Sequence, residues 1–301
     1  MSGSYLNLAP EVLEKRASAL RELLKDCTVC PRLCRVDRTA GEKGFCRTLD
    51  KPFLSSWGPH FGEERPISGR RGSGTIFFAN CNLCCIYCQN WSISRMAEGT
   101  PISTERLADI MLELQASGCH NINLVSPSHQ VPMFVDALLA ALKKGLRVPI
   151  VYNTGGYDMV ETLKLLDGVV HIYMPDFKYW DPEAAGKLSG AADYPQRARA
   201  ALKEMHRQAG DLVIEDGVAR KGLLVRHLVL PGGLSGSTDI MRFIAAEISK
   251  ETYVNIMDQY YPCYKAWSYP PLDRRISPAE YEEAVNAALR AGIKRVDGVT
   301  V

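Results

Sequence analysis

Three cysteines in one short loop carry the clearest chemical signal of the chain. Cys81, Cys85 and Cys88 follow an apolar, strand-like stretch with the spacing C-x3-C-x2-C. A tight loop of this kind can place three thiolates on three irons of one 4Fe-4S cluster, whereas an electron-transfer cluster takes a fourth cysteine. The fourth iron then stays open, and an open coordination position distinguishes a catalytic metal site from a closed structural one. A zinc knuckle is the alternative, but zinc sites favour paired C-x2-C units with four ligands.

A second group of cysteines precedes the first. Cys27, Cys30, Cys34 and Cys46 lie close together, and glycines in the gap before Cys46 permit the tight turns that let backbone N–H groups approach sulfur. A closed set of four thiolates suits structural zinc and a second iron–sulfur cluster equally well, so the spacing leaves the metal open. The alternative is four unligated thiols, which this clustering disfavours.

Composition and charge narrow the class of protein. The 301 residues are 46% apolar and 23% charged, with a formal net charge of +2 and dispersed Lys and Arg, which argues against a nucleic-acid partner. The first residues lack the basic and apolar regions of a secretion signal, and no apolar stretch is long enough to span a bilayer. We therefore expect a cytoplasmic protein without a membrane partner, whose ten cysteines serve metal or redox chemistry.

These cysteines must be positioned by a scaffold, and the chain beyond them alternates strand-like and helix-like segments. This rhythm is typical of a parallel α/β sheet or barrel, and periodicity alone equally permits an open doubly wound sheet. A packing helix is predicted over residues 10–25, before the cysteines, and Ser277 begins a capping box at the last helix. The predicted strands are 75–78, 121–126, 148–153, 169–174, 223–230 and 252–258.

Ligands of parallel α/β folds lie at the carboxyl ends of the strands, and several of these ends are polar here. Asp176 and Lys178 are two residues apart, so they share one face of their strand. Arg226 lies in an apolar strand, where a guanidinium needs a carboxylate partner, while the adjacent His227 points the other way and fits a core position. An ordinary ion pair is the alternative interpretation of Asp176 and Lys178.

The segment from Cys81 to Asn90 resembles the radical S-adenosylmethionine (SAM) superfamily, in the branch of pyruvate formate-lyase activating enzyme. That family shares C-x3-C-x-(aromatic)-C, with Tyr87 in the aromatic position, and the branch continues as Cys88-Gln89-Asn90 does. The resemblance implies a partial (β/α)6 TIM-like barrel over residues 75–301. Residues 1–74 would then form an N-terminal helix and a four-cysteine metal-binding segment.

The resemblance also implies SAM on the open iron and a monovalent cation beside its carboxylate. Asp176 inherits the cation role, although Asn153 stands where the family often has a second acidic ligand. At Ser126 and His129 the chain departs from the family's Gly-Gly-Glu-like segment, and either these residues replace that contact or the loop is merely polar. The residues expected near the cofactor are Tyr87, Asn90, Ser126, His129, Asn153, Thr154, Asp176, Lys178, Arg226 and Gln259.

Radical chemistry follows from the same resemblance. A flavodoxin- or ferredoxin-type donor would reduce the cluster, SAM would be cleaved, and the 5'-deoxyadenosyl radical would abstract a hydrogen atom. The usual target in this branch is a glycine of a partner glycyl radical enzyme; a peptide side chain, a nucleoside or a small metabolite is the alternative. A non-catalytic metal-binding or electron-transfer module is a third hypothesis, but it has no use for Asp176, Lys178 and Arg226 together at strand ends.

Overall fold

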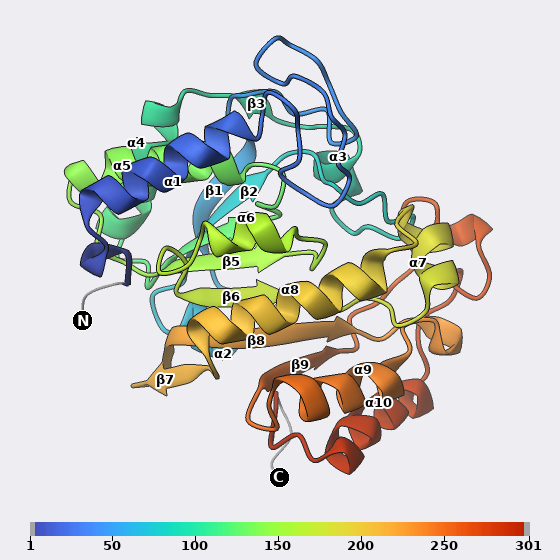
Figure 1. The fold of residues 1–301 in the computed structure, drawn as a ribbon. Helices are drawn as coiled ribbons and strands as arrows, with labels where there is room; N and C mark the ends of the chain where they lie inside the picture. Colours follow the sequence, from blue (N-terminus) through green and yellow to red (C-terminus); the bar gives the residue numbers. More distant parts are fainter. Residues whose placement is uncertain (1–3, 298–301) are drawn as a thin grey trace.

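The computed structural model of the chain describes residues 4–297 (Figure 1). Residues 1–3 of the predicted N-terminal segment and residues 298–301 of the predicted core domain lie outside the described residues.

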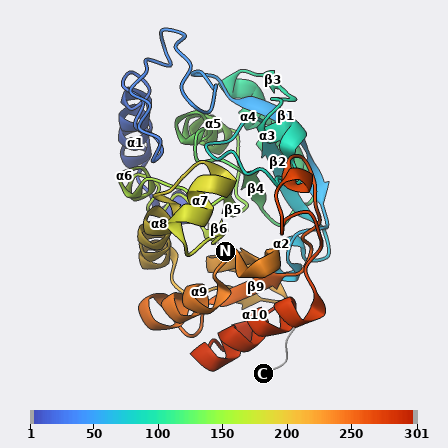
Figure 2. The same cartoon turned by 90° about the vertical axis from the view of Figure 1, so that its right-hand side faces the viewer.

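Six parallel strands form the centre of the structure, and all six strands predicted from the sequence are confirmed. They are neighbours in the order in which they occur along the chain, which is the order of a barrel and not of a doubly wound sheet. Figure 2 looks toward their carboxyl ends, with helices arranged around the outside. The six are β2 (Ser73–Phe78), β4 (Ile122–Val125), β5 (Ile150–Thr154), β6 (Ile172–Pro175), β8 (Val218–Leu228) and β9 (Tyr253–Met257).

Four further strands extend this sheet, and the sequence analysis did not predict them. β1 pairs antiparallel with β2, β3 with β1, and β7 with β8, whereas β10 is parallel to β9. The described strands form an open path from β10 to β3 without closing into a ring. β3 pairs only with Phe53 and Leu54, so the Gly-Pro further along β1 has a neighbouring strand on one side alone among the described strands, where proline is tolerated. The four are β1 (Phe53–His60), β3 (Thr100–Pro101), β7 (Val213–Glu215) and β10 (Arg295–Val296).

Helices cover the outer face of the sheet, and their ends follow local capping rules. Ser103 accepts a hydrogen bond from the N–H of Arg106, Ser277 forms the predicted capping box with Glu280, and Gly292 ends the last helix in the left-handed region. The helices are α1 (Pro10–Glu22), α2 (Arg65–Ser68), α3 (Trp91–Ser94), α4 (Thr104–Ala116), α5 (Val131–Lys143), α6 (Val160–Lys164), α7 (Pro182–Ser189), α8 (Tyr194–Ala209), α9 (Ser237–Phe243) and α10 (Pro278–Ala291).

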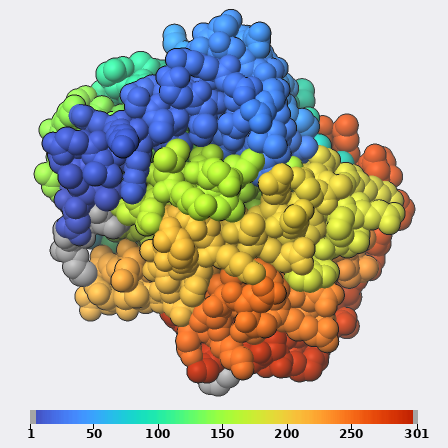
Figure 3. Space-filling model, in the orientation of Figure 1, coloured from blue at the N-terminus to red at the C-terminus, as the bar shows by residue number. Residues whose placement is uncertain are grey.

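The described part of the N-terminal segment packs against the barrel-like core. Helix α1 lies against α5, and the Tyr5 hydroxyl donates to the carbonyl of Val148 at 2.6 Å. In the space-filling view of Figure 3 this segment, in blue, forms one continuous surface with the rest of the molecule. Because β1 belongs to the central sheet, part of residues 1–74 is built into the core, and a domain boundary at residue 74 stays a prediction.

No helix within residues 4–297 combines the length and the apolar character that crossing a membrane requires.

Candidate functional site

The cysteine loop, residues 79–90, leaves the carboxyl end of β2 and is fixed by backbone hydrogen bonds. The N–H of Cys84 donates to the carbonyl of Ser189 at 3.2 Å, and the N–H of Ile86 donates to that of Leu188 at 2.9 Å. Both acceptors lie at the end of α7. The loop is therefore anchored to a helix on the far side of the site and not only to its own strand.

Each sulfur of the three-cysteine set has a polar neighbour. The N–H of Leu83 donates to Cys81 Sγ at 3.4 Å, and the Ser189 hydroxyl donates to Cys85 Sγ at 2.9 Å. Cys88 Sγ lies 3.3 Å from the hydroxyl oxygen of Ser94. Such donors stabilise a thiolate and tune the potential of a cluster bound to it.

Burial acts against the thiolate form when no metal is present. It raises the pKa of Cys81 to about 12 and that of Cys85 to about 11, the latter opposed by the positive charge of Lys178. Within residues 4–297 no three His, Cys, Asp or Glu side chains form a group that could hold a single metal ion. Three thiols in one tight loop match the ligand set of a multinuclear cluster, in which each thiolate binds a different iron.

A pocket of ≈ 240 Å³ opens beside the three cysteines, at the carboxyl ends of the strands. Nine of the ten residues expected near the cofactor line it, as do all three cysteines. Those nine are Tyr87, Asn90, Ser126, Asn153, Thr154, Asp176, Lys178, Arg226 and Gln259.

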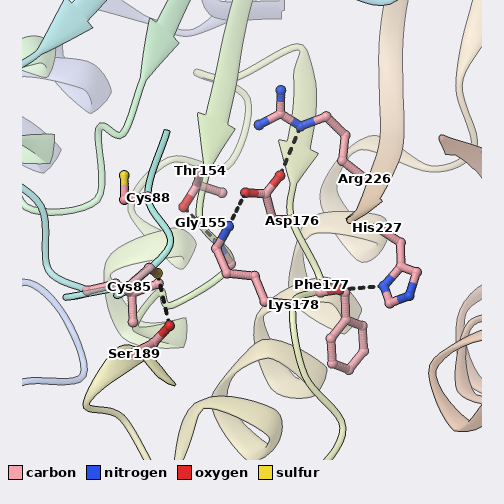
Figure 4. Close-up of polar contacts among 12 residues, drawn as sticks. Cys85, Cys88, Thr154, Gly155, Asp176, Phe177, Lys178, Ser189, Arg226 and His227 are labelled. Carbon is pink, nitrogen blue, oxygen red and sulfur yellow. Dashed lines mark hydrogen bonds and ion pairs between the residues drawn. The ribbon is translucent and has the colours of Figure 1, made fainter. Parts of the chain in front are cut away.

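Asp176, Lys178 and Arg226 form one ion-pair network in this pocket (Figure 4). Asp176 accepts from Lys178 Nζ at 2.5 Å and from Arg226 Nε at 2.9 Å, and all three side chains are at most one-fifth exposed. Burial alone would raise the pKa of Asp176, but Arg226 and Lys178 hold it below its usual value. The pair is therefore buried and directed at the pocket, not a surface ion pair.

Arg226 has two more partners, and one of them was not predicted from the sequence. Its Nη2 donates to Asn153 Oδ1 at 2.7 Å, and its Nη1 lies 3.6 Å from Glu63 Oε2. Burial raises the pKa of Glu63, opposed by Arg226. Glu63 precedes α2 and reaches the barrel interior, where Asn123 Nδ2 donates to it at 2.9 Å. No local pattern marks it, because the contact joins segments far apart in the chain.

The end of β5 is held against β6 by close packing. A Cβ atom on Gly156, which has φ +78°, would lie 2.1 Å from the carbonyl oxygen of Asp176. Only a residue without a side chain fits at this position, so Gly156 allows the ends of the two neighbouring strands to approach each other closely. Thr154 also faces inward, and its hydroxyl donates to Asp158 at 2.6 Å.

His129 is the predicted cofactor residue that lies outside the pocket. It is only 1% exposed, and its Nε2 lies 3.1 Å from the carbonyl oxygen of Ala79. Burial and the charge of Arg38 lower its pKa to about 3, so the ring is neutral. The backbone of Ser126 has φ +57°, and this turn leaves Ser126 at the pocket while His129 enters the protein interior.

Three hydroxyl groups behind the cysteine loop form a chain that the sequence did not reveal. The Tyr179 hydroxyl oxygen lies 2.6 Å from the hydroxyl oxygens of both Tyr87 and Ser189, and the Ser189 hydroxyl in turn donates to Cys85. Ser189 and Tyr179 are fully buried, so water cannot replace either group. This chain fixes the donor to Cys85. His227 points the other way, as predicted, with its Nδ1 2.7 Å from the carbonyl oxygen of Phe177.

The cysteines Cys27, Cys30, Cys34 and Cys46 are brought together around a second, smaller cavity. Arg32 connects this region to the cysteine loop, since its Nε donates to the carbonyl of Asn82 at 2.7 Å.

A chain-ordered parallel α/β sheet with a cysteine-lined pocket at its strand ends defines a cofactor-binding protein of the partial-barrel class. The radical SAM superfamily model matches residues 75–219. An uncharacterized protein of Methanocaldococcus jannaschii, MJ0674, is 32% identical over 287 residues, covering 93% of this chain and 79% of the relative. The chain belongs to the radical SAM superfamily, which implies a 4Fe-4S cluster and SAM.

Two further comparisons found similar proteins. A second uncharacterized protein of the same organism, MJ0808, is 24% identical over 294 residues, covering 90% of this chain and 79% of the relative. The solved structure described as native anSMEcpe with bound AdoMet has a TM-score of 0.50 at 12% identity. That match covers 77% of this chain and 62% of the other, and it shows similarity of fold.

Proposed function

We propose that this protein is a radical SAM enzyme that cleaves SAM reductively and abstracts a hydrogen atom from a substrate at the strand-end pocket. One observation supports this most directly. The three cysteines of the loop and the network of Asp176 and Arg226 line the same pocket, so a metal cluster and a charged small molecule would meet there.

The residues of the pocket would have separate roles. Cys81, Cys85 and Cys88 would hold the cluster, and the cationic groups of Lys178 and Arg226 would face the carboxylate of SAM. When bound, the cluster supplies one electron to SAM, which separates into methionine and a 5'-deoxyadenosyl radical that takes a hydrogen atom from the substrate. The protein fixes the reacting groups and limits the entry of water.

The partners are part of the same proposal. A flavodoxin- or ferredoxin-type protein in the cytoplasm would supply the electron, and the substrate would be a glycine of a glycyl radical enzyme, as in the activating enzymes. The CxxxCxYCQN segment supports this choice. A monovalent cation would lie beside Asp176, whose carboxylate stays ionised between its two cationic neighbours.

A second candidate is a radical SAM enzyme acting on another peptide, a nucleoside or a small molecule. Two departures from the activating enzymes favour it. His129 turns inward and Ser128 bonds Thr154 at 2.9 Å, so the segment after β4 is engaged within the protein. The four-cysteine segment also contacts the cysteine loop directly, through Arg32.

The test begins with anaerobic reconstitution, reduction with dithionite and chromatographic detection of 5'-deoxyadenosine after SAM is added. Cys85→Ala should abolish the product, while Cys84→Ala, a change of the adjacent thiol, should retain it. Absence of product from the wild-type protein with a fully loaded, reducible cluster, alone and with cell extract added, would contradict the proposal.

Cell extract then separates the two candidates. Faster 5'-deoxyadenosine formation with the macromolecular fraction, lost after protease treatment, supports a protein substrate. Stimulation by the small-molecule filtrate that survives protease supports a nucleoside or metabolite.

A further inference from the structure

The four N-terminal cysteines form a second built site, separate from the strand-end pocket. Cys27, Cys30 and Cys46 are buried and Cys34 is partly exposed, and all four thiols are free. They surround a cavity of ≈ 10 Å³, about the space of one water molecule. The remaining lining residues are Val29, Arg32, Leu33, Arg38, Gly44 and His129.

The backbone around these cysteines is strained in a way that a bound group would explain. Leu33, Arg35 and Arg47 have φ values of 46°, 56° and 58°, in the left-handed region that non-glycine residues rarely adopt. Each of them directly adjoins Cys34 or Cys46. Strained residues persist where the surroundings over-determine them, and they gather at binding sites.

The backbone at Gly44 and Phe45 approaches Cys34 closely, which also indicates a site for a bound group. A Cβ atom on Gly44 would lie 2.8 Å from Cys34 Sγ, so only glycine fits there. This allows the N–H of Phe45 to donate to Cys34 Sγ at 3.3 Å. Backbone N–H groups directed at sulfur stabilise a thiolate, which is the form that binds metal.

The buried charge of Arg38 is the strongest evidence for a bound anionic group, because no carboxylate in the described part of the chain pairs with it. The side chain is 1% exposed, and within residues 4–297 no ion pair includes it. Its guanidinium donates to the carbonyls of Leu49 and His129 at 3.1 Å and 2.9 Å and lies 3.9 Å from Cys27 Sγ. A buried cation requires a compensating anion, and a metal centre with four thiolates carries negative charge.

His129 adds an independent polar group at this cavity. Its Nδ1 is buried and has no hydrogen-bond partner in the described part of the chain. Buried polar atoms without a partner are rare, and one at the wall of a cysteine-lined cavity points to a group that the cavity would hold.

We propose that Cys27, Cys30, Cys34 and Cys46 hold a second, fully ligated iron–sulfur cluster of the 4Fe-4S type, with Arg38 as its buried counter-charge. Zinc fits less well. It would draw all four sulfurs to about 2.3 Å from one centre, which leaves no room for water among them. The cavity has such room, and no three of these side chains form a single-ion site within residues 4–297. A cluster that binds each thiolate to a different iron suits this wider arrangement.

The first experiment isolates the second site by replacing Cys81, Cys85 and Cys88 with alanine in the full chain. After anaerobic reconstitution we expect about four irons and four sulfides per chain, visible absorption that bleaches on reduction, and no zinc. Cys30→Ala in this background should remove the iron and sulfide, whereas Cys119→Ala should retain them. One zinc per chain without sulfide, or no bound metal at all, would overturn the proposal.

The wild-type protein provides a measurement that does not depend on the folding of these variants. It should hold about eight irons and eight sulfides per chain, and about four of each would contradict a second cluster. Because this is a metal count, it stays valid even if SAM is not cleaved.

A pair of arginine variants tests the counter-charge. Arg38→Gln should release iron from the second site at least tenfold faster than the parent. Arg21→Gln is the matched control, since Arg21 belongs to helix α1 and pairs with Asp136 away from the four cysteines. Equal iron release from both variants would refute the role of Arg38.

Discussion

The hydroxyl of Ser189 gives the sharpest test of how the protein tunes the cluster. It donates to Cys85 Sγ at 2.9 Å and is fully buried, so Ser189→Ala removes a donor that water cannot replace. A hydrogen bond to a charged acceptor contributes about 1.5–3 kcal/mol, against about 1 kcal/mol for a neutral one. We take the difference, ~1 kcal/mol, as the preference of this bond for the reduced, more negative cluster. For a one-electron couple this equals ~40 mV, so the potential should fall by that amount.

The assay is a redox titration of the reconstituted protein, followed by electron paramagnetic resonance. Replacing Cys34 with alanine in all samples removes the proposed second cluster from the signal. Ser235→Ala is the matched control, because it also removes a fully buried serine hydroxyl, but one that accepts from the N–H of Leu230 and contacts no cysteine of the loop. An unchanged or raised potential in Ser189→Ala, at equal iron content, would refute the reasoning.

Three further variants test the scaffold of the pocket. Asp176→Asn removes the carboxylate that two buried cations share, and only Arg226 keeps another, Glu63 at 3.6 Å. It should lower the free energy of unfolding by ~3 kcal/mol, measured by denaturant titration; a loss below ~1 kcal/mol would contradict a buried network. Gly156→Ala should weaken SAM binding, measured by calorimetry, because the added Cβ would lie 2.1 Å from a carbonyl oxygen. Gly217→Ala is the control: Gly217 also has a positive φ, but an added Cβ would have no atom within 4 Å, so this variant should bind SAM normally. Burial lowers the pKa of His227 to about 4, so below the unfolded value of about 6.5 the unfolded state binds more protons. The free energy of unfolding should therefore fall by up to ~3 kcal/mol as the pH is lowered from 6.5 to 4, and His227→Gln should make this pH dependence shallower. The same pH profile in the variant and the wild type would contradict a buried, neutral His227.

Local sequence patterns predicted the elements that local chemistry determines. The six parallel strands and the capping box at Ser277 follow from apolar runs and capping residues within a few positions. β1 was not predicted, because it is formed by antiparallel pairing with β2, a contact between segments that no local pattern marks. The sequence left open whether His129 faces the cofactor, because its inward turn depends on the φ of +57° at Ser126, and serine carries no signal for that conformation.

In the candidate site, too, the residues that were predicted from the sequence are those placed by local structure. Cys81, Cys85 and Cys88 were evident because their spacing lies within one loop, and Asp176 and Lys178 because a strand alternates its faces.

Glu63 shows why the electrostatics of the pocket could not be predicted. It comes from the segment before α2, yet it approaches Arg226 of β8 and accepts from Asn123 of β4. Arg226 thus faces two carboxylates, Asp176 and Glu63, before any ligand binds. Under the proposed function, the carboxylate of SAM would compete with both for the guanidinium, while its positively charged sulfonium and amino groups would be attracted to the same acidic side chains. We infer that the pocket selects a ligand carrying both signs of charge, which a simple anion would not match.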